Sequence, residues 1–159
     1  VEVSSSEVDV YSLKSGDVLF VRSSVKPSGV GLTTVVIDNL HNTVFSGFLL
    51  RFRGGGFKPN FARYAFRTSM FRAQVIARST VSANTNINQE NLNKVQVAFP
   101  VDMSEQDRIA ARLSAIDERI ATDERVVAKY RSVKAGLMQR LLSPPGDAEV
   151  VDETILEAV

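Results

Sequence analysis

The most regular hydrophobic pattern of this chain lies between Ser104 and Ser143. Apolar residues recur there at intervals of four and three, as they do along one face of a long helix. Such a sustained repeat is typical of a coiled coil, and the helix would be roughly 58 Å long at about 1.5 Å per residue. The residues predicted to pair with another helix are Ile109, Leu113, Ile116, Ile120, Val127, Tyr130, Leu137 and Leu141. The alternative is an amphipathic helix that lies on its own domain.

Two polar residues, Asp123 and Lys134, interrupt this seam, and polar seam positions set register at some cost in stability. Ser104 is predicted to cap the helix, with Glu105 in the first turn. Pro144-Pro145-Gly146 ends it. The tail, residues 144–159, carries five acidic residues and no basic one, and we expect it to be disordered or to dock on a partner.

Shorter apolar runs precede the helix. Strands are predicted at Val18–Val21, Thr33–Ile37, Phe45–Arg53, Ala73–Ser82 and Lys94–Pro100, and a short helix at residues 59–71, where Pro59 fits the first turn. The fold class expected is α+β: a compact, strand-rich domain with a short helix at residues 1–103, followed by one long coiled-coil-forming helix at 104–143 and the tail.

Length and composition are those of one domain with a helical arm. The chain has 159 residues, of which 44% are hydrophobic and 23% charged, and no apolar run is long enough to cross a membrane. It has no cysteine, which excludes disulfides and thiolate metal sites and is compatible with a cytoplasmic location.

The charge is unevenly distributed along the chain. Residues 11–103 hold 11 Lys and Arg against 4 Asp and Glu, whereas residues 104–159 hold 8 against 11. A basic domain of this kind favours nucleic-acid binding, and the alternative is an ordinary solvated surface.

Basic and small polar residues gather in or beside the predicted loops. Lysine and arginine neutralise phosphates, arginine also pairs with guanine, and hydroxyl and amide groups add hydrogen bonds. The predicted DNA-binding residues are Arg22, Ser23, Lys26, Arg51, Arg53, Lys58, Arg63, Arg67, Arg78, Thr80, Ser82 and Asn84, with Arg72 beside them in the sequence. The nine phenylalanines are predicted to form the core and not to stack on bases.

No pattern indicates catalysis. His41 is the only histidine and lies in a turn-rich loop, and the domain's few carboxylates are scattered. The glycine runs lack the context of a phosphate loop, and Lys58-Pro59-Asn60-Phe61 only superficially echoes an adenine-methyltransferase motif. We expect no catalytic residue, no metal and no cofactor.

Several segments together resemble one known family. They are LKSGDVLFVRSS, FLLRFR, PNFARYAFRTSMF, STVSANTNINQENLNKVQVAFP and, most specifically, SEQDRIAARLSAIDERI with KAGLMQRLLS. Across residues 11–143 the chain resembles the specificity subunit of type I restriction–modification systems. The resemblance implies a non-catalytic subunit whose recognition domain reads one half of a split sequence in double-stranded DNA. It also implies a long helix that packs antiparallel against a second one, and partners that methylate adenine (modification subunits) or cleave DNA (a restriction subunit).

The chain departs from that pattern because a full subunit has two recognition domains and two helices. The usual lead-in, with a tryptophan, is missing before Val1. We therefore expect a C-terminal fragment or a half-length subunit, paired through its helix with the second half or with a second copy. Two alternatives stay open: a coiled-coil assembly protein whose globular head binds protein, and a methyltransferase or nuclease, for which no cofactor or metal pattern is found.

Overall fold

In the computed structural model, which describes residue 8 and residues 10–143, the apolar run at Val18–Val21 forms strand β1. It is the central strand of an antiparallel sheet with the order β3-β1-β4, where β3 is Thr33–Val35 and β4 is Leu49–Phe52. Phe20 lies opposite Thr33 on one side and Leu50 on the other. The three strands are confirmed, but the last two are shorter than predicted. Before β4, a turn in which Leu49 N–H donates to Ser46 C=O breaks the ladder (2.9 Å).

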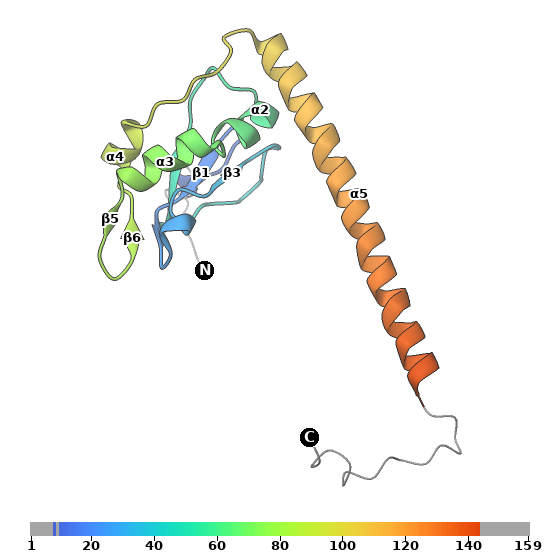
Figure 1. Cartoon of the computed structure of the whole chain (residues 1–159). Helices are drawn as coiled ribbons and strands as arrows, with labels where there is room; N and C mark the ends of the chain where they lie inside the picture. The colour runs from blue at the N-terminus through green and yellow to red at the C-terminus, as the bar shows by residue number, and fades with distance from the viewer. Residues whose placement is uncertain (1–7, 9, 144–159) are drawn as a thin grey trace. The chain divides into compact units, whose positions relative to one another are not determined.

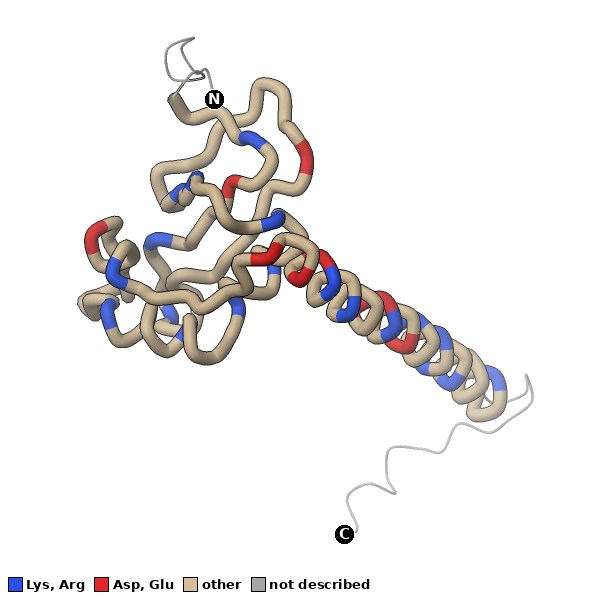
Figure 2. Tube along the Cα trace, turned by 90° about the horizontal axis from the view of Figure 1, so that it is seen from above, with Lys and Arg blue, Asp and Glu red and all other residues tan. Residues whose placement is uncertain are grey.

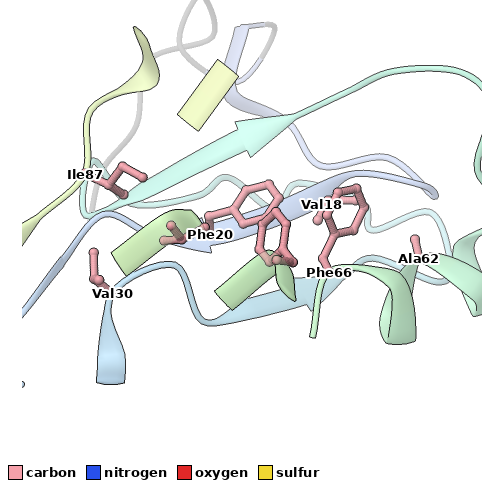
Figure 3. Close-up of a cluster of buried hydrophobic side chains, with 8 residues drawn as sticks. Val18, Phe20, Val30, Ala62, Phe66 and Ile87 are labelled. Atoms are coloured by element: carbon pink, nitrogen blue, oxygen red, sulfur yellow. The ribbon is translucent and has the colours of Figure 1, made fainter. Parts of the chain in front are cut away.

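Both faces of this sheet are covered. Val18 and Phe20 point into the main core, whereas Leu19 packs with Leu13 and Val36 in a smaller cluster. Figure 3 shows Phe20 in the middle of the main core, with Val30 and Ile87 towards one end and Ala62 towards the other. Phe20 meets Phe66 edge-on at a centroid distance of 5.4 Å. The prediction that the phenylalanines form the core is confirmed for Phe20, Phe61, Phe66 and Phe71, which are buried, and is wrong for Phe48, which is 75% exposed.

The prediction of one helix at residues 59–71 followed by a strand at 73–82 is wrong. Two helices, α2 at Pro59–Ala65 and α3 at Ser69–Ala77, lie against β1 and β3 (Figure 1). Between them Thr68 is extended, and its side chain caps α3 by accepting from Phe71 N–H. Phe71 and Val75 are buried four residues apart, so this apolar run has the period of a helix although it contains β-branched residues.

A second, smaller antiparallel sheet has the order β2-β6-β5. Its strands are β2 at Ser23–Ser24, β5 at Thr80–Val81 and β6 at Thr85–Asn86, and β5 and β6 form the hairpin visible in Figure 1. A 3-10 turn, η1 at Pro27–Gly29, follows β2. Of the strand predicted at residues 73–82, only Thr80–Val81 is strand.

The strand predicted at Lys94–Pro100 is also wrong. Helix α4 occupies Gln89–Asn93, and the segment after it belongs to neither sheet. Val95 and Val97 pack on the main core as the alternation predicts. The backbone of Gln96 is bonded by a side chain instead of a strand: its C=O accepts from Gln74 Nε2 (2.9 Å) and its N–H donates to Gln74 Oε1 (3.1 Å).

The long helix is confirmed as α5, Met103–Leu142. Its cap is Asp102 and not Ser104, because the Asp102 carboxylate accepts from Ser104 N–H (2.8 Å) and from Ser104 Oγ (2.7 Å). Those hydrogen bonds lower the pKa of Asp102. None of the described helices is long and apolar enough to span a membrane. The acidic tail lies outside the described residues.

The chain divides into two compact units after Ser114, within α5. The first unit includes the start of α5, where Ile109 and Ala110 pack against Phe61 and Ala65. In the second unit, every described residue from 115 to 142 is exposed. The predicted seam is therefore split: Ile109 and Leu113 are partly buried in the first unit, while the positions from Ile116 onward are exposed.

Candidate nucleic-acid interface

The small sheet brings together polar residues that are far apart in the sequence. Ser23 of β2 lies opposite Asn86 of β6, and Asn86 lies opposite Thr80 of β5. Residues directly opposite in antiparallel strands point to the same face, so these three side chains form one polar row. Ser82 and Asn84 form the tip of the same hairpin, where Ser82 N–H donates to Asn84 C=O (3.1 Å).

The ends of these segments are anchored in the main core. Val30, just after η1, and Ile87, just after β6, are 0% and 1% exposed, and both are drawn in Figure 3. Ile87 N–H donates to Arg22 C=O (3.0 Å), and Gly31 N–H donates to Val21 C=O (2.7 Å). The loops therefore extend from fixed points and can present polar groups in a defined geometry.

Arg72 of α3 forms hydrogen bonds with the turn that follows β2. Its guanidinium donates to Ser28 C=O (2.7 Å) and to Val30 C=O. Burial lowers its pKa, and no carboxylate contacts it among the described residues. From the sequence, Arg72 groups with the basic surface residues. Its role in fixing the turn could not be predicted, because more than 40 positions separate it from Ser28 and Val30.

Two cations of this region are free to bind a ligand. Arg22 and Lys26 are exposed, and neither side chain has a hydrogen bond or an ion pair within the described part of the chain. They flank β2, next to the polar row. Arg67 donates to Thr33 C=O in β3 (3.2 Å), and Arg63 lies near the ring of Tyr64, 5.9 Å from its centroid. Figure 2 colours the described Lys and Arg residues blue and the described Asp and Glu residues red; residues 11–103 hold 11 basic positions against 4 acidic ones.

Other predicted DNA-binding residues are engaged elsewhere. Arg53 forms a two-pronged ion pair with Asp17, at 2.6 Å for both contacts, and also donates to Ser12 C=O (2.8 Å). Arg51 donates to Ser12 C=O (3.0 Å) and lies over the Phe45 ring. These two arginines tie the start of the domain to β4.

The carboxylate of this pair is buried, whereas the Arg53 side chain is 39% exposed. Burial alone would raise the pKa of Asp17, which is 1% exposed, but the hydrogen bonds from Arg53 and from Lys14 N–H lower it further than burial raises it. The positive charges of Arg53 and Arg51 act in the same direction. Asp17 is therefore an ionised structural carboxylate.

Lys58 and Arg78 also have partners. Lys58 Nζ pairs with Asp107 Oδ2 at 3.3 Å, and Arg78 ends α3, where its C=O accepts from Asn91 Nδ2 (3.0 Å). The latter contact links α3 to α4 near the hairpin. Of the predicted set, the structure therefore gathers Arg22, Ser23, Lys26, Thr80, Ser82 and Asn84 around the small sheet, and gives Arg51, Arg53 and Lys58 other surroundings.

Gln106 fixes the start of α5 to the domain. Its side chain is 0% exposed; Oε1 accepts from Lys58 N–H (2.8 Å), and Nε2 donates to Gly56 C=O (2.7 Å) and Pro100 C=O (2.8 Å). The side-chain amide of Gln106 therefore bonds three backbone groups, at Lys58, Gly56 and Pro100, that have no such partner within a helix or a sheet. Gln106 lies four residues after the cap, and its partners Lys58 and Gly56 are 48 and 50 positions away, so no local pattern in the sequence pointed to this role.

No side-chain cluster suited to a metal is found among the described residues. His41 is exposed in a turn, where its C=O accepts from Thr43 Oγ1. A hollow of about 640 Å³ in the domain is lined mainly by phenylalanines and aliphatic residues of β4 and of segment 92–99, together with Arg51 and Arg53. No carboxylate or histidine is among the described residues that line it.

The described chain is thus a small α+β domain that presents polar and basic loops and continues into a long helix with exposed apolar residues. The family model of the type I restriction modification DNA specificity domain matches residues 11–129, and the chain belongs to this family. The family is one of specificity domains, in agreement with a chain that is not itself an enzyme.

A solved structure supports the fold. The chain is similar to the crystal structure of the type I restriction–modification S subunit from M. genitalium, with a TM-score of 0.58 and 19% sequence identity. The match covers 94% of this chain and 36% of that subunit, so the chain spans about a third of its length. The α+β fold class with a long helix is thereby confirmed. None of the curated proteins matches the chain.

Proposed function

We propose that the first unit reads one half of a split sequence in double-stranded DNA, as the recognition domain of a type I restriction–modification specificity subunit. The observation that carries the proposal is the polar row of this chain's small sheet. The row lies beside Arg22 and Lys26, two exposed cations without a partner among the described residues. Membership of the specificity-domain family supports DNA as the ligand.

The proposed contact surface consists of the β2-β6-β5 sheet, the hairpin tip and the turn at residues 26–31. Hydroxyl and amide groups of the row, Ser23, Thr80 and Asn86, are donors and acceptors of the kind that read base edges. Arg22 and Lys26 are proposed to contact phosphates, which position the domain but carry no sequence information. A two-stranded ribbon is narrow enough to enter the major groove.

The test uses a duplex recovered by selection from a random library with the whole chain. Binding to this duplex is expected to weaken steeply with salt, and R22A and K26A should each reduce the slope of log K against log salt by about one. The matched control is K14A, which removes an exposed cation at the other end of β1. If the charge reversals R22E and K26E leave DNA association unchanged, the alternative of a protein-binding head is favoured.

We further propose that α5 pairs with a related helix and that modification and restriction subunits dock on the resulting assembly. The exposed apolar face widens towards the end of α5, where Met138 and Leu142 lie to one side of the Tyr130–Leu137 seam and Val133 lies to the other. A single partner helix covers a seam, whereas a wider apolar face fits additional helices. This width supports docking of helices from a partner subunit beside the pair.

Docking is tested by purifying the chain together with its modification subunit. M138E combined with L142E should reduce the amount of modification subunit retained, without changing the self-association of α5. S132E, on the exposed opposite side of the helix, is the control. If M138E/L142E and S132E retain equal amounts of the modification subunit, docking at this end of α5 is ruled out.

A further inference from the structure

An apolar side chain lies within the proposed DNA-contact surface. Val25 directly follows β2 and precedes Lys26, and it is 81% exposed. Apolar residues scattered singly on a protein surface need no explanation by themselves. Val25 differs from such residues because its neighbours on both sides belong to the surface that we propose to contact DNA.

We propose that Val25 reads a thymine of the half-site by packing on its 5-methyl group in the major groove. The inference rests on the proposed reading of DNA by the first unit. It adds one specificity-determining residue and the group on the base that this residue recognises.

The backbone that carries Val25 is held in place by several contacts. Lys26 N–H donates to Ser24 Oγ (3.3 Å), and Gly29 N–H donates to Lys26 C=O (2.9 Å). A side chain at position 29 would collide with the Ser24 hydroxyl, so the turn folds tightly against β2. From α3, Arg72 bonds two carbonyl groups of the same turn. Val25 is therefore carried by a fixed backbone, which a contact between methyl groups requires.

A second exposed valine of the small sheet, Val81, belongs to the other face. It is 74% exposed and lies opposite Thr85, which is 2% exposed. Opposite residues of paired strands share a face, and successive residues of one strand alternate between faces. Val81 therefore shares the face of Thr85, whereas Ser23, Asn86 and Thr80 form the polar row on the opposite face. This makes Val81 a matched control of similar exposure on the same sheet.

The major groove offers one specific partner to an apolar side chain. Guanine, cytosine and adenine present hydrogen-bond donors and acceptors there, whereas thymine also presents a methyl group at C5. A valine side chain has no donor or acceptor, so it gains free energy by covering this methyl group and gains none from the polar edges. Contact with a deoxyribose would also be apolar, but it would not depend on the base.

The tip of the hairpin agrees with a half-site that contains A·T pairs. The side chains of Ser82 and Asn86 both donate to Asn84 C=O, at 3.3 and 3.0 Å, which fixes the backbone of the tip. The side-chain amide of Asn84 has no hydrogen-bond partner within the described part of the chain. Such an amide matches the N6 and N7 atoms of adenine. An amide suited to adenine and a valine suited to thymine both select A·T pairs.

Removal of the methyl group alone tests the contact. Each thymine of the selected duplex is replaced in turn by uracil, which pairs with adenine in the same way and lacks only the 5-methyl group. At one position, the replacement should lower the affinity of the whole wild-type chain by about four-fold, the effect of one buried methyl group. Fluorescence anisotropy at a fixed salt concentration measures this affinity.

The variant V25A connects the effect to Val25. V25A should bind the unmodified duplex about four-fold more weakly than the wild type does, and it should no longer distinguish thymine from uracil at that position. V81A should keep the full difference between the two duplexes. Both substitutions fall on exposed residues, and circular dichroism checks that both variants are folded.

Three results would overturn the proposal. If V25A keeps the wild-type difference between thymine and uracil, another side chain contacts the methyl group. A wild-type chain that is indifferent to uracil at every position, or a selected half-site without thymine, would exclude methyl reading. In each case DNA reading by the first unit stands as long as binding still weakens steeply with salt. A chain without salt-dependent binding to any duplex would overturn the proposed function, and this inference with it.

Discussion

At the scale of single residues, the side chains that matter most to the fold are those whose partners lie far away in the sequence. Gln106 is the clearest example, because its buried amide bonds to the backbone at Gly56, Lys58 and Pro100. A carboxylate of the same shape can accept but cannot donate, so Q106E would leave two carbonyl groups facing a buried negative charge. Neither position 56 nor 58 could be assigned to Gln106 from spacing, since the separation is about 50 residues.

We expect Q106E to lower the free energy of unfolding by about 2–4 kcal/mol, the cost of burying unsatisfied and repelling polar groups. Urea denaturation followed by circular dichroism measures it. Q139E introduces the same charge at an exposed position of α5 and should change the unfolding free energy by less than about 0.5 kcal/mol. Equal stability of the two variants would mean that Gln106 does not fasten α5 to the domain.

The lowered pKa of Asp17 makes the free energy of unfolding depend on pH. Its pKa is lowered in the folded chain from an ordinary value of 3.8, so its ion pair with Arg53 stabilises the fold fully above pH 3.8. That contribution is lost as the pH falls through the lower, folded pKa. D17N removes the charge, and the gap in unfolding free energy between wild type and D17N should be about 1–2 kcal/mol at pH 7, because Arg53 is 39% exposed and screening reduces the value of the pair.

The measurement is a series of urea denaturations from pH 7 down to pH 2.5. The gap between wild type and D17N should narrow only below pH 3.8. D38N, which removes an exposed carboxylate, should follow the wild-type curve. A gap that stays constant to pH 2.5 would show that the charge of Asp17 is not what stabilises this site.

At the scale of elements, the sequence predicts well wherever a local pattern and the tertiary packing agree. β1 and α5 are such cases, since an apolar β-branched run and a seven-residue repeat each have one good structural solution. The prediction is wrong where a side chain supplies what a strand would have supplied. Gln74 bonds both backbone groups of Gln96, so the alternation of Val95 and Val97 is real but the ladder is absent.

The predictions for the candidate interface are also correct for some residues and not for others, again because of partners that lie far away in the sequence. Arg22 and Lys26 were predicted together with Arg51 and Arg53, because all four are basic residues near predicted strands. Arg53 is engaged by Asp17, 36 residues earlier, and Arg51 by the Ser12 C=O, 39 residues earlier, and neither partner could be assigned from a local pattern. The strand register could not be predicted either, because the row of Ser23, Asn86 and Thr80 depends on pairing between strands of only two residues each.

Arg72 gives a prediction about the turn that it braces. R72M keeps most of the apolar stem of the side chain but removes both hydrogen bonds to the carbonyl groups of Ser28 and Val30, so the turn beside Lys26 should lose its fixed position. Because Arg72 bonds the protein and not a phosphate, DNA affinity should fall by about 10-fold while the salt slope stays unchanged. K26A, in contrast, should reduce the slope.

The measurement is fluorescence anisotropy of the selected duplex over a range of salt, with both variants checked for folding by circular dichroism. A reduced slope in R72M would indicate that this guanidinium leaves the turn and contacts DNA directly.

At the scale of the whole molecule, the pairing of α5 would join two DNA-reading domains. Two linked domains bind a duplex with two half-sites more tightly than one domain can, because the second contact becomes intramolecular. I116E combined with I120E places charges in the exposed part of the seam, outside the first unit, and should yield a monomer whose domain stays folded.

We expect this monomer to lose on the order of 100-fold in affinity for a duplex that carries both half-sites, and to keep its affinity for a duplex that carries one. Its salt slope on the longer duplex should fall to about half, since half as many phosphates are contacted. Anisotropy titrations on the two duplexes measure both quantities, and E118Q, on an exposed position outside the seam, is the control. If the monomer loses affinity equally on both duplexes, the helix contributes to the binding of a single site, and α5 would be part of the reading surface and not a connection between two of them.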